Sequence, residues 1–242
     1  MAGTFYTIGV GPGDPELITV KAARLINRAP VVAYFAKRGK TGHARMIAAD
    51  YVSATSELLR LDYPFTTEIP FAEPPYQNGM RQFYDDSAAI IASRLDKGQD
   101  VALLCEGDPF FYGSSMYIFD RLEEAGYRIE IIPGITGMSG CWTRARLPML
   151  HGDDVMSILP ATLPEADLTT RLRACNAAVI MKVGGNLPHV RRALAAAGLA
   201  DRAVYVERGT MEEERILKLT EFDQERAPYF SLILVPGRVS SR

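Results

Sequence analysis

The sequence has few of the residues that mark disulfide-bonded or metal-binding proteins. It holds three cysteines and three histidines among 242 residues, and the cysteines lie far apart. An odd, scattered set of cysteines argues against a disulfide framework and favours reduced thiols in a cytoplasmic protein. The histidines have no metal-ligand spacing among themselves or with cysteine, so no metal site is expected.

The chain also lacks long apolar runs and a strong net charge. No apolar run reaches the ~18 residues of a membrane-spanning helix, and no basic segment followed by an apolar one marks a secretory signal. The formal net charge is -2, which gives no general attraction to nucleic acid. We therefore expect neither a membrane nor a nucleic acid as a partner.

Short apolar runs alternate with segments of helical spacing, and this alternation predicts an α/β fold with a parallel sheet. In the first half, strands are expected at residues 5–10, 31–34, 57–61, 101–105 and 129–132. In the second half, they are expected at residues 155–159, 178–183, 204–206 and 229–235. A hairpin-like segment at 208–219 should add antiparallel character to the second sheet.

Proline, glycine and capping residues mark the boundaries of the expected helices. Asp14 fits an N-cap with Pro15 at the first position of a helix over 16–26. Residues 62–77 are rich in proline and predict a long loop before a helix at 80–95. The aromatic residues of this segment either form a flap over a ligand or pack on the domain; they are Tyr63, Phe65, Phe71 and Tyr76.

The turn at 133–137 combines proline and glycine and is the expected hinge between two halves. Thr136 could cap the helix that follows it. We therefore expect an N-terminal domain over 1–136 and a C-terminal domain over 137–242.

Glycine-rich loops follow the expected strands, at the edge where open α/β sheets bind ligands. Gly9, Gly11 and Gly13 do not match the dinucleotide fingerprint, because the third glycine comes one residue early. The segment 38–41 resembles the end of a phosphate-binding loop, but Tyr34 stands where the first glycine is required. No nucleophile elbow is present. The sequence therefore offers no recognisable phosphate cradle.

Three of these loops carry carboxylates, at Asp14, Glu106 and Asp108. Carboxylates at a ligand site favour a cation over a phosphate. S-Adenosylmethionine, a sulfonium without phosphate, fits this requirement. The alternative is that these residues only form turns and helix caps.

Three motifs carry a resemblance to a known family: Gly9–Pro15 with Leu17–Ala23, Glu106–Gly113, and Ile132–Thr136. In this order and spacing they resemble the signature set of the tetrapyrrole (corrin/porphyrin) methyltransferases, from residue 8 to residue 235. Four further segments resemble the branch of that family that methylates C20 of precorrin-2: Gly107–Ser114, Leu159–Pro164, Val179–Val183 and Pro228–Ser231.

The resemblance implies two α/β domains, with a parallel N-terminal sheet, a mixed C-terminal sheet and S-adenosylmethionine in the cleft between them. It also implies a tetrapyrrole substrate, a homodimer and methyl transfer to a carbon of the macrocycle. Alternatives are a methylase of the same fold acting on another corrin carbon, cobalt-factor II, diphthine or ribosomal RNA. A non-catalytic nucleotide-binding module is a further alternative.

The resemblance also points to site residues at the matching positions. Cofactor contacts are expected at Pro12, Glu106, Gly107, Asp108, Thr136, Gly137, Met181, Arg208, Gly209 and Ser231. Relatives often carry serine or alanine at the position of Gly137, so only a backbone contact is expected there. Asp108 is the candidate base, with Tyr112 and Tyr229 as orienting residues; a loop-fixing or ribose-binding Asp108 is the alternative.

The substrate of this family carries many carboxylates, so basic residues should line its site. The candidates are Arg38, Lys40, Arg45, Arg81 and Arg144. For each of them, a solvated surface position is the alternative. If they act as a group, salt should weaken substrate binding.

Overall fold

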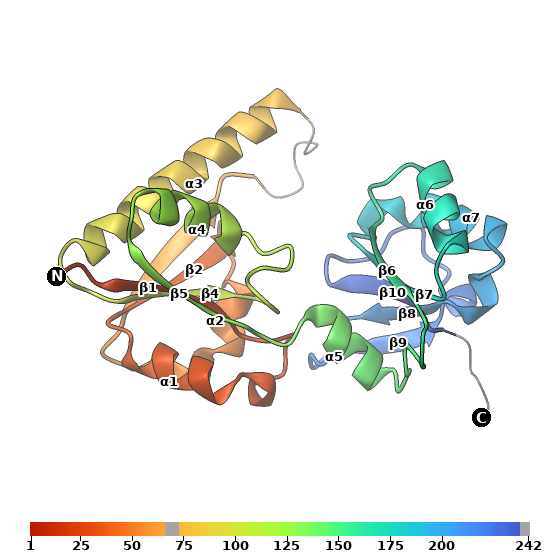
Figure 1. Ribbon diagram of the computed structural model, residues 1–242, viewed down its shortest axis with the longest axis horizontal. Helices are drawn as coiled ribbons and strands as arrows, with labels where there is room; N and C mark the ends of the chain where they lie inside the picture. Colours follow the sequence, from red (N-terminus) through yellow and green to blue (C-terminus); the bar gives the residue numbers. More distant parts are fainter. Residues whose placement is uncertain (66–72, 238–242) are drawn as a thin grey trace. The chain divides into compact units, whose positions relative to one another are not determined.

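The computed structural model describes residues 1–65 and 73–237. The chain divides into two compact units, Met1–Gly137 and Met138–Arg242 (Figure 1). Each unit is built around its own five-stranded sheet.

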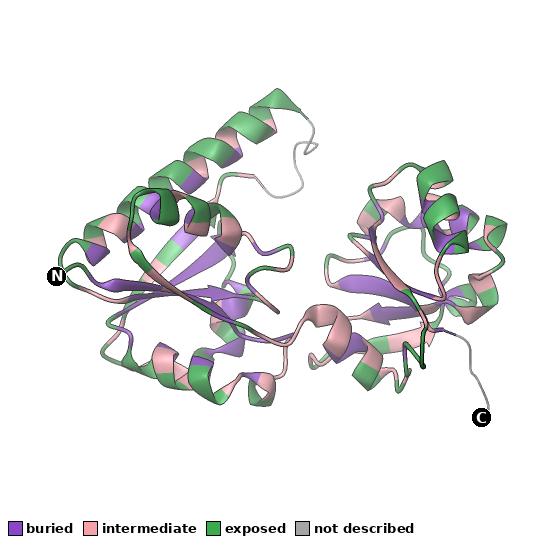
Figure 2. Cartoon of the chain, in the orientation of Figure 1, coloured by how far each residue is buried: buried purple, intermediate pink, exposed green. Residues whose placement is uncertain are grey.

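The first unit contains an entirely parallel sheet in the order β3-β2-β4-β1-β5. Its strands are β1 (Thr4–Gly9), β2 (Val31–Lys37), β3 (Glu57–Tyr63), β4 (Val101–Cys105) and β5 (Arg128–Ile132). The central strand β4 is buried along its whole length (Figure 2). Such a strand is a continuous apolar run because helices cover both faces of the sheet.

Helices α1 (Val20–Arg28) and α2 (His43–Ile47) cover one face of this sheet. Helices α3 (Pro74–Leu95) and α4 (Ser115–Glu124) cover the other face (Figure 1). The adjacent strands β1 and β4 therefore send their following helices to opposite faces. This arrangement is the topological switch point, where open α/β sheets leave a crevice for ligands beyond the strand ends.

The second unit contains a mixed sheet in the order β6-β7-β10-β8-β9. Its strands are β6 (Met156–Pro160), β7 (Ala177–Met181), β8 (Val204–Glu207), β9 (Arg215–Lys218) and β10 (Ser231–Val235). Only β6 and β7 pair in parallel, and the remaining pairs are antiparallel. The expected α/β fold with a parallel first sheet and a mixed second sheet is confirmed.

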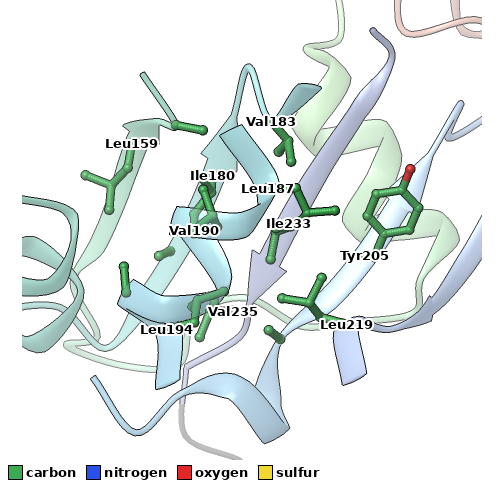
Figure 3. Packing of buried hydrophobic residues seen from close by; sticks show 14 of the residues in the cluster. Leu159, Ile180, Val183, Leu187, Val190, Leu194, Tyr205, Leu219, Ile233 and Val235 are labelled. Carbon is green, nitrogen blue, oxygen red and sulfur yellow. The ribbon is translucent and has the colours of Figure 1, made fainter. Parts of the chain in front are cut away.

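Helices α6 (Glu165–Arg173) and α7 (Leu187–Ala196) cover one face of the second sheet. Figure 3 shows side chains of α7 gathered with those of β7 and β10: Leu187, Val190, Leu194, Ile180, Ile233 and Val235. Helix α5 (Gly137–Arg144) contributes Cys141 and Trp142 to the cluster on the opposite face.

Short 3-10 turns complete the described elements: η1 (Pro15–Leu17), η2 (Ala49–Tyr51), η3 (Gly184–Asn186), η4 (Ala200–Arg202) and η5 (Leu219–Glu221). In residues 1–65 and 73–237, no helix is both long and apolar enough to cross a membrane.

The prediction of a single helix over 16–26 is wrong, because the segment forms two separate helical elements. Asp14 does cap a helical turn, because its side chain accepts a hydrogen bond from the Glu16 N–H, but that turn is only η1. Ile18 is extended, and α1 begins after Thr19, whose hydroxyl accepts from the Ala22 N–H at 3.2 Å. Two consecutive caps therefore divide the predicted helix.

The expected limits of the loop over 62–77 are wrong at both ends. Strand β3 continues to Tyr63, and α3 already begins at Pro74, since proline suits the first turn of a helix. Tyr63 stacks on Phe35 with ring centroids 5.3 Å apart, so this aromatic residue packs on the first unit. Tyr76, in α3, packs against the same core, with its ring centroid 6.4 Å from that of Phe65, whereas Phe71 lies outside the described residues.

Replacing Leu103 by alanine tests the central strand. Leu103 is fully buried in β4, so we expect the free energy of unfolding to fall by roughly 2–5 kcal/mol. Leu58→Ala, on the edge strand β3 and 45% exposed, is the matched control, expected to change stability by about 0.5 kcal/mol or less. Urea unfolding should be followed by circular dichroism, because the single tryptophan, Trp142, lies in the second unit. Equal losses for the two variants would contradict the assignment of β4 as the core strand.

Candidate active site

Three glycine turns meet at the carboxyl ends of β1, β4 and β5. The Gly107 N–H donates to the Gly11 carbonyl at 2.8 Å, and the Gly11 N–H donates to the Gly107 carbonyl at 3.3 Å. Gly107 has a φ of 64°, in the left-handed region that favours glycine. The turns after β1 and β4, which the sequence analysis singled out separately, are thus one hydrogen-bonded unit.

Side chains are excluded where these turns touch. A Cβ atom on Gly134 would lie 2.1 Å from the Gly107 carbonyl oxygen. A Cβ atom on Gly9 would lie 2.6 Å from both that oxygen and the Gly134 nitrogen. At Gly9, Gly107 and Gly134 the turns therefore touch through their peptide groups.

Most of the predicted cofactor residues of the first unit lie at this contact. A Cβ atom on Gly107 would lie 3.4 Å from the Gly137 nitrogen and 3.8 Å from the Thr136 Cα atom. Pro12 is buried in the turn after β1, next to the paired Gly11. Residues from three separate stretches of sequence are thereby brought together.

Asp108 joins two of the turns through its carboxylate. One oxygen, Oδ1, accepts from the Phe110 N–H at 2.9 Å, and the other, Oδ2, accepts from the Gly134 N–H at 3.1 Å. An ionised carboxylate forms strong hydrogen bonds of this kind. The contacts support a loop-fixing role for Asp108, and its role as a base stays a prediction.

Glu106 holds the segment that follows β2. Its Oε1 accepts from the Ala44 N–H at 3.2 Å, near the start of α2. Although Glu106 is exposed as a residue, its carboxyl group is packed among protein atoms, and this burial raises its pKa. The backbone N–H groups of Glu106 and Ala44, followed by the charge on His43, act in the opposite direction.

The turn after β4 carries backbone strain above a buried thiol. Tyr112 has a φ of 57°, which is uncommon for a residue with a side chain, and is 46% exposed. A Cβ atom on the neighbouring Gly113 would lie 2.8 Å from the Cys105 sulfur. Burial raises the pKa of Cys105 to about 12, so this thiol is a packing group and a poor nucleophile.

The predicted basic residues lie in one turn and in three different helices. Arg38 and Lys40 are exposed in the turn after β2, and Arg45 lies in α2. Because β2 adjoins β4, these three residues follow strand ends at the same edge of the sheet as the glycine turns. Arg81 is exposed on α3, whereas Arg144 lies on α5 and forms an ion pair with Glu214 at 2.8 Å.

In the second unit, the predicted residues gather at one edge of the mixed sheet. Met181 ends β7 and Ser231 begins β10, while Arg208 directly follows β8. Since β10 runs antiparallel to both neighbours, its first residue lies beside their last residues. Ser231 donates its hydroxyl to the Pro228 carbonyl at 2.7 Å, and Tyr229 is 85% exposed.

Left-handed backbone conformations mark two of the turns at this edge. Lys182 follows β7 with a φ of 59°, and Arg208 and Thr210 follow β8 with φ values of 50° and 71°. Strained residues of this kind gather at functional sites. Gly209 lies between them, and a Cβ atom there would be 2.6 Å from the Cys141 sulfur.

Sequence reasoning missed several residues that shape these edges. Gly9 and Gly134 were noted within motifs, but only the structure shows that no side chain fits there. Glu214 received no role, and nothing in its sequence context signals its contacts with Arg144 and Thr210. Among residues 1–65 and 73–237, no group of three or more histidine, cysteine, aspartate or glutamate side chains could hold a metal ion.

Comparison with known proteins adds sequence evidence to this geometry. Residues 4–223 match the family model described as Tetrapyrrole (Corrin/Porphyrin) Methylases. The chain is 51% identical to a precorrin-2 C(20)-methyltransferase of Sinorhizobium sp. over 235 residues, which cover 97% of this chain and 96% of that protein. It is 28% identical to the cobalt-precorrin-2 C(20)-methyltransferase of Salmonella typhimurium, with 97% of each chain covered.

A solved structure shares the fold at lower sequence identity. The uroporphyrin-III C-methyltransferase of Thermus thermophilus, complexed with S-adenosylhomocysteine, matches with a TM-score of 0.66 and 22% identity. The match covers 97% of this chain and 92% of that one. From the family match and from the 51% identity over nearly the whole length, the chain belongs to the tetrapyrrole (corrin/porphyrin) methylase family.

Proposed function

We propose that this protein is an S-adenosylmethionine-dependent methyltransferase that methylates C20 of precorrin-2 in cobalamin biosynthesis, giving precorrin-3A. The observation that carries the proposal is the 51% identity to a precorrin-2 C(20)-methyltransferase across 97% of the chain. Identity to the cobalt-precorrin-2 C(20)-methyltransferase of Salmonella typhimurium is only 28%, which favours the metal-free substrate. Methylation of another corrin carbon or of cobalt-factor II is the second candidate.

The glycine turns of the first unit fit the methyl donor in shape and charge. Peptide groups line the contact at Gly9, Gly107 and Gly134, so backbone can approach a ligand closely. The neighbouring carboxylates Glu106 and Asp108 favour a cation, and the donor carries its positive charge on sulfur. The donor supplies an electrophilic methyl group, which C20 attacks while the methyl–sulfur bond breaks.

The residues of the chain have to position the two reactants. The reduced macrocycle is itself the carbon nucleophile, so orientation supplies much of the acceleration, and orientation can contribute about 7–11 kcal/mol. The C20 carbon must then lose its proton. We propose Asp108 as the proton acceptor and Tyr112 and Tyr229 as orienting residues.

The proposed donor contacts in the first unit are Pro12, Glu106, Gly107, Asp108, Thr136 and Gly137, and in the second unit Met181, Arg208, Gly209 and Ser231. The proposed contacts to substrate carboxylates are Arg38, Lys40, Arg45, Arg81 and Arg144. Arg144 would have to share its guanidinium with Glu214. We further propose that the units act as domains 1–136 and 137–242, and that the protein is a cytoplasmic homodimer.

The substrate assignment is tested by direct assay. The protein should transfer one methyl group to precorrin-2, detected by mass spectrometry, and should transfer it more slowly to cobalt-precorrin-2. S-Adenosylhomocysteine should raise the melting temperature, because a ligand that binds only the folded state stabilises it. ATP and NAD are the control ligands. Stabilisation by ATP or NAD without stabilisation by S-adenosylhomocysteine would contradict a methyltransferase.

Replacing Asp108 by asparagine separates its two possible roles. We expect kcat to fall by roughly 100-fold, because a general base is lost, while the affinity for S-adenosylhomocysteine falls by about tenfold or less. Asp120→Asn, at an exposed position of α4, is the matched control for loss of charge. Unchanged kcat with weakened binding by calorimetry would leave Asp108 with the loop-fixing role alone.

Replacing Gly134 by alanine tests the contact between the turns. The new Cβ atom would collide with the Gly107 carbonyl, so we expect a loss of stability of roughly 1–3 kcal/mol and weaker binding of S-adenosylhomocysteine. Gly185→Ala is the control, because its Cβ atom would meet nothing closer than Arg226 at 3.9 Å. Calorimetry and thermal unfolding measure both effects, and wild-type affinity in Gly134→Ala would refute the proposed contact.

A further inference from the structure

The hairpin connection between β8 and β9, residues 208–214, has a backbone that its own sequence does not favour. Thr210 has a φ of 71°, and β-branched residues almost never adopt this region. Arg208 is also left-handed, with a φ of 50°. A conformation of this kind persists only where surrounding contacts hold it.

Helix α5 supports this connection at two points. Cys141 lies directly beneath Gly209, where a Cβ atom would be 2.6 Å from its sulfur and 3.2 Å from its Cα atom. Arg144 lies three residues further along the helix, on the same face. Its Nε atom donates to both carboxylate oxygens of Glu214, at 2.9 and 2.8 Å.

The Glu214 carboxylate links Arg144 to Thr210, the strained residue of the connection. Its Oε2 atom accepts from the Thr210 N–H at 2.7 Å, and its side chain is only 15% exposed. The hydrogen bond from Arg144 is the main cause that lowers the pKa of Glu214, and the Thr210 N–H adds to it. The carboxylate is therefore charged near neutral pH and forms strong hydrogen bonds to both donors.

We propose that Glu214, oriented by Arg144, is a positioning residue that holds the Arg208–Thr210 turn in the conformation required for binding the methyl donor. The inference rests on the proposed function, in which Arg208 and Gly209 contact the donor. Glu214 acts through the backbone of the turn and does not itself touch the donor. Arg144 thereby gains a role in donor binding, besides its proposed contact to the substrate.

Two variants of Glu214 and one neighbour test the proposal. Glu214→Ala removes the acceptor for the Thr210 N–H, so we expect the affinity for S-adenosylhomocysteine to fall about tenfold or more. The KM for S-adenosylmethionine should rise more than the KM for precorrin-2. Glu214→Gln keeps one acceptor oxygen, so its affinity for S-adenosylhomocysteine should fall less than that of Glu214→Ala. Glu212→Gln, an exposed position in the same connection, is the matched control and should bind as the wild type does.

A second substitution distinguishes positioning from direct contact. Glycine adopts the left-handed region without strain, so Thr210→Gly combined with Glu214→Ala should recover part of the lost affinity. A carboxylate that touched the donor directly could not be replaced in this way. Calorimetry measures the affinities, and circular dichroism checks that each variant is folded; if Glu214→Ala does not fold, Glu214→Gln takes its place.

The outcomes separate the inference from the function on which it rests. A wild-type protein that fails to bind S-adenosylhomocysteine overturns both. A wild-type protein that binds, with a Glu214→Ala variant of equal affinity, overturns the positioning role and leaves the proposed function intact. Reduced affinity without recovery by Thr210→Gly also overturns it, since the effect would then not pass through the turn.

Discussion

The close approach of three peptide segments, at Gly9, Gly107 and Gly134, is the constraint on which the first unit depends. A methyl group at Gly134 would lie 2.1 Å from a carbonyl oxygen, a distance that no packed structure tolerates. The parallel topology creates this contact, because β1 lies between β4 and β5 and all three strands end at the same edge. Glycine allows their following turns to hydrogen-bond there, which leaves an edge made of backbone at the topological switch point.

Carboxylates fix the turns at the two sheet edges that carry the proposed site residues. Glu106 accepts from the Ala44 N–H, Asp108 from the Gly134 N–H, and Glu214 from the Thr210 N–H. Glu106 and Asp108 each hold the backbone of a distant segment, whereas Glu214 holds the backbone of its own turn. An ionised acceptor is well suited to this because its hydrogen bonds are stronger than those between neutral groups. The same charges make the first edge unfavourable for phosphate and favourable for a cation.

The fold was predictable where a segment carries its own signal. The run at 101–105 is apolar throughout and is bounded by turn residues, and the observed β4 has the same limits. The helix over 16–26 was not predicted correctly, since Asp14 and Thr19 each cap a separate helical segment and their spacing alone does not show which cap prevails. The sequence did not predict that α3 begins at Pro74, because Pro74 and Pro75 suit a loop and the first turn of a helix equally well.

The sequence by itself determined the α/β class, the glycine turns that follow the strands, and the family, because local composition and the order of motifs specify these. Only the tertiary structure decided which turns touch and what each carboxylate does. Asp108 meets Gly134 across 26 residues, and Glu214 meets Arg144 across 70. Hydrogen bonds over such separations depend on strand order and helix packing, which no local pattern of residues encodes.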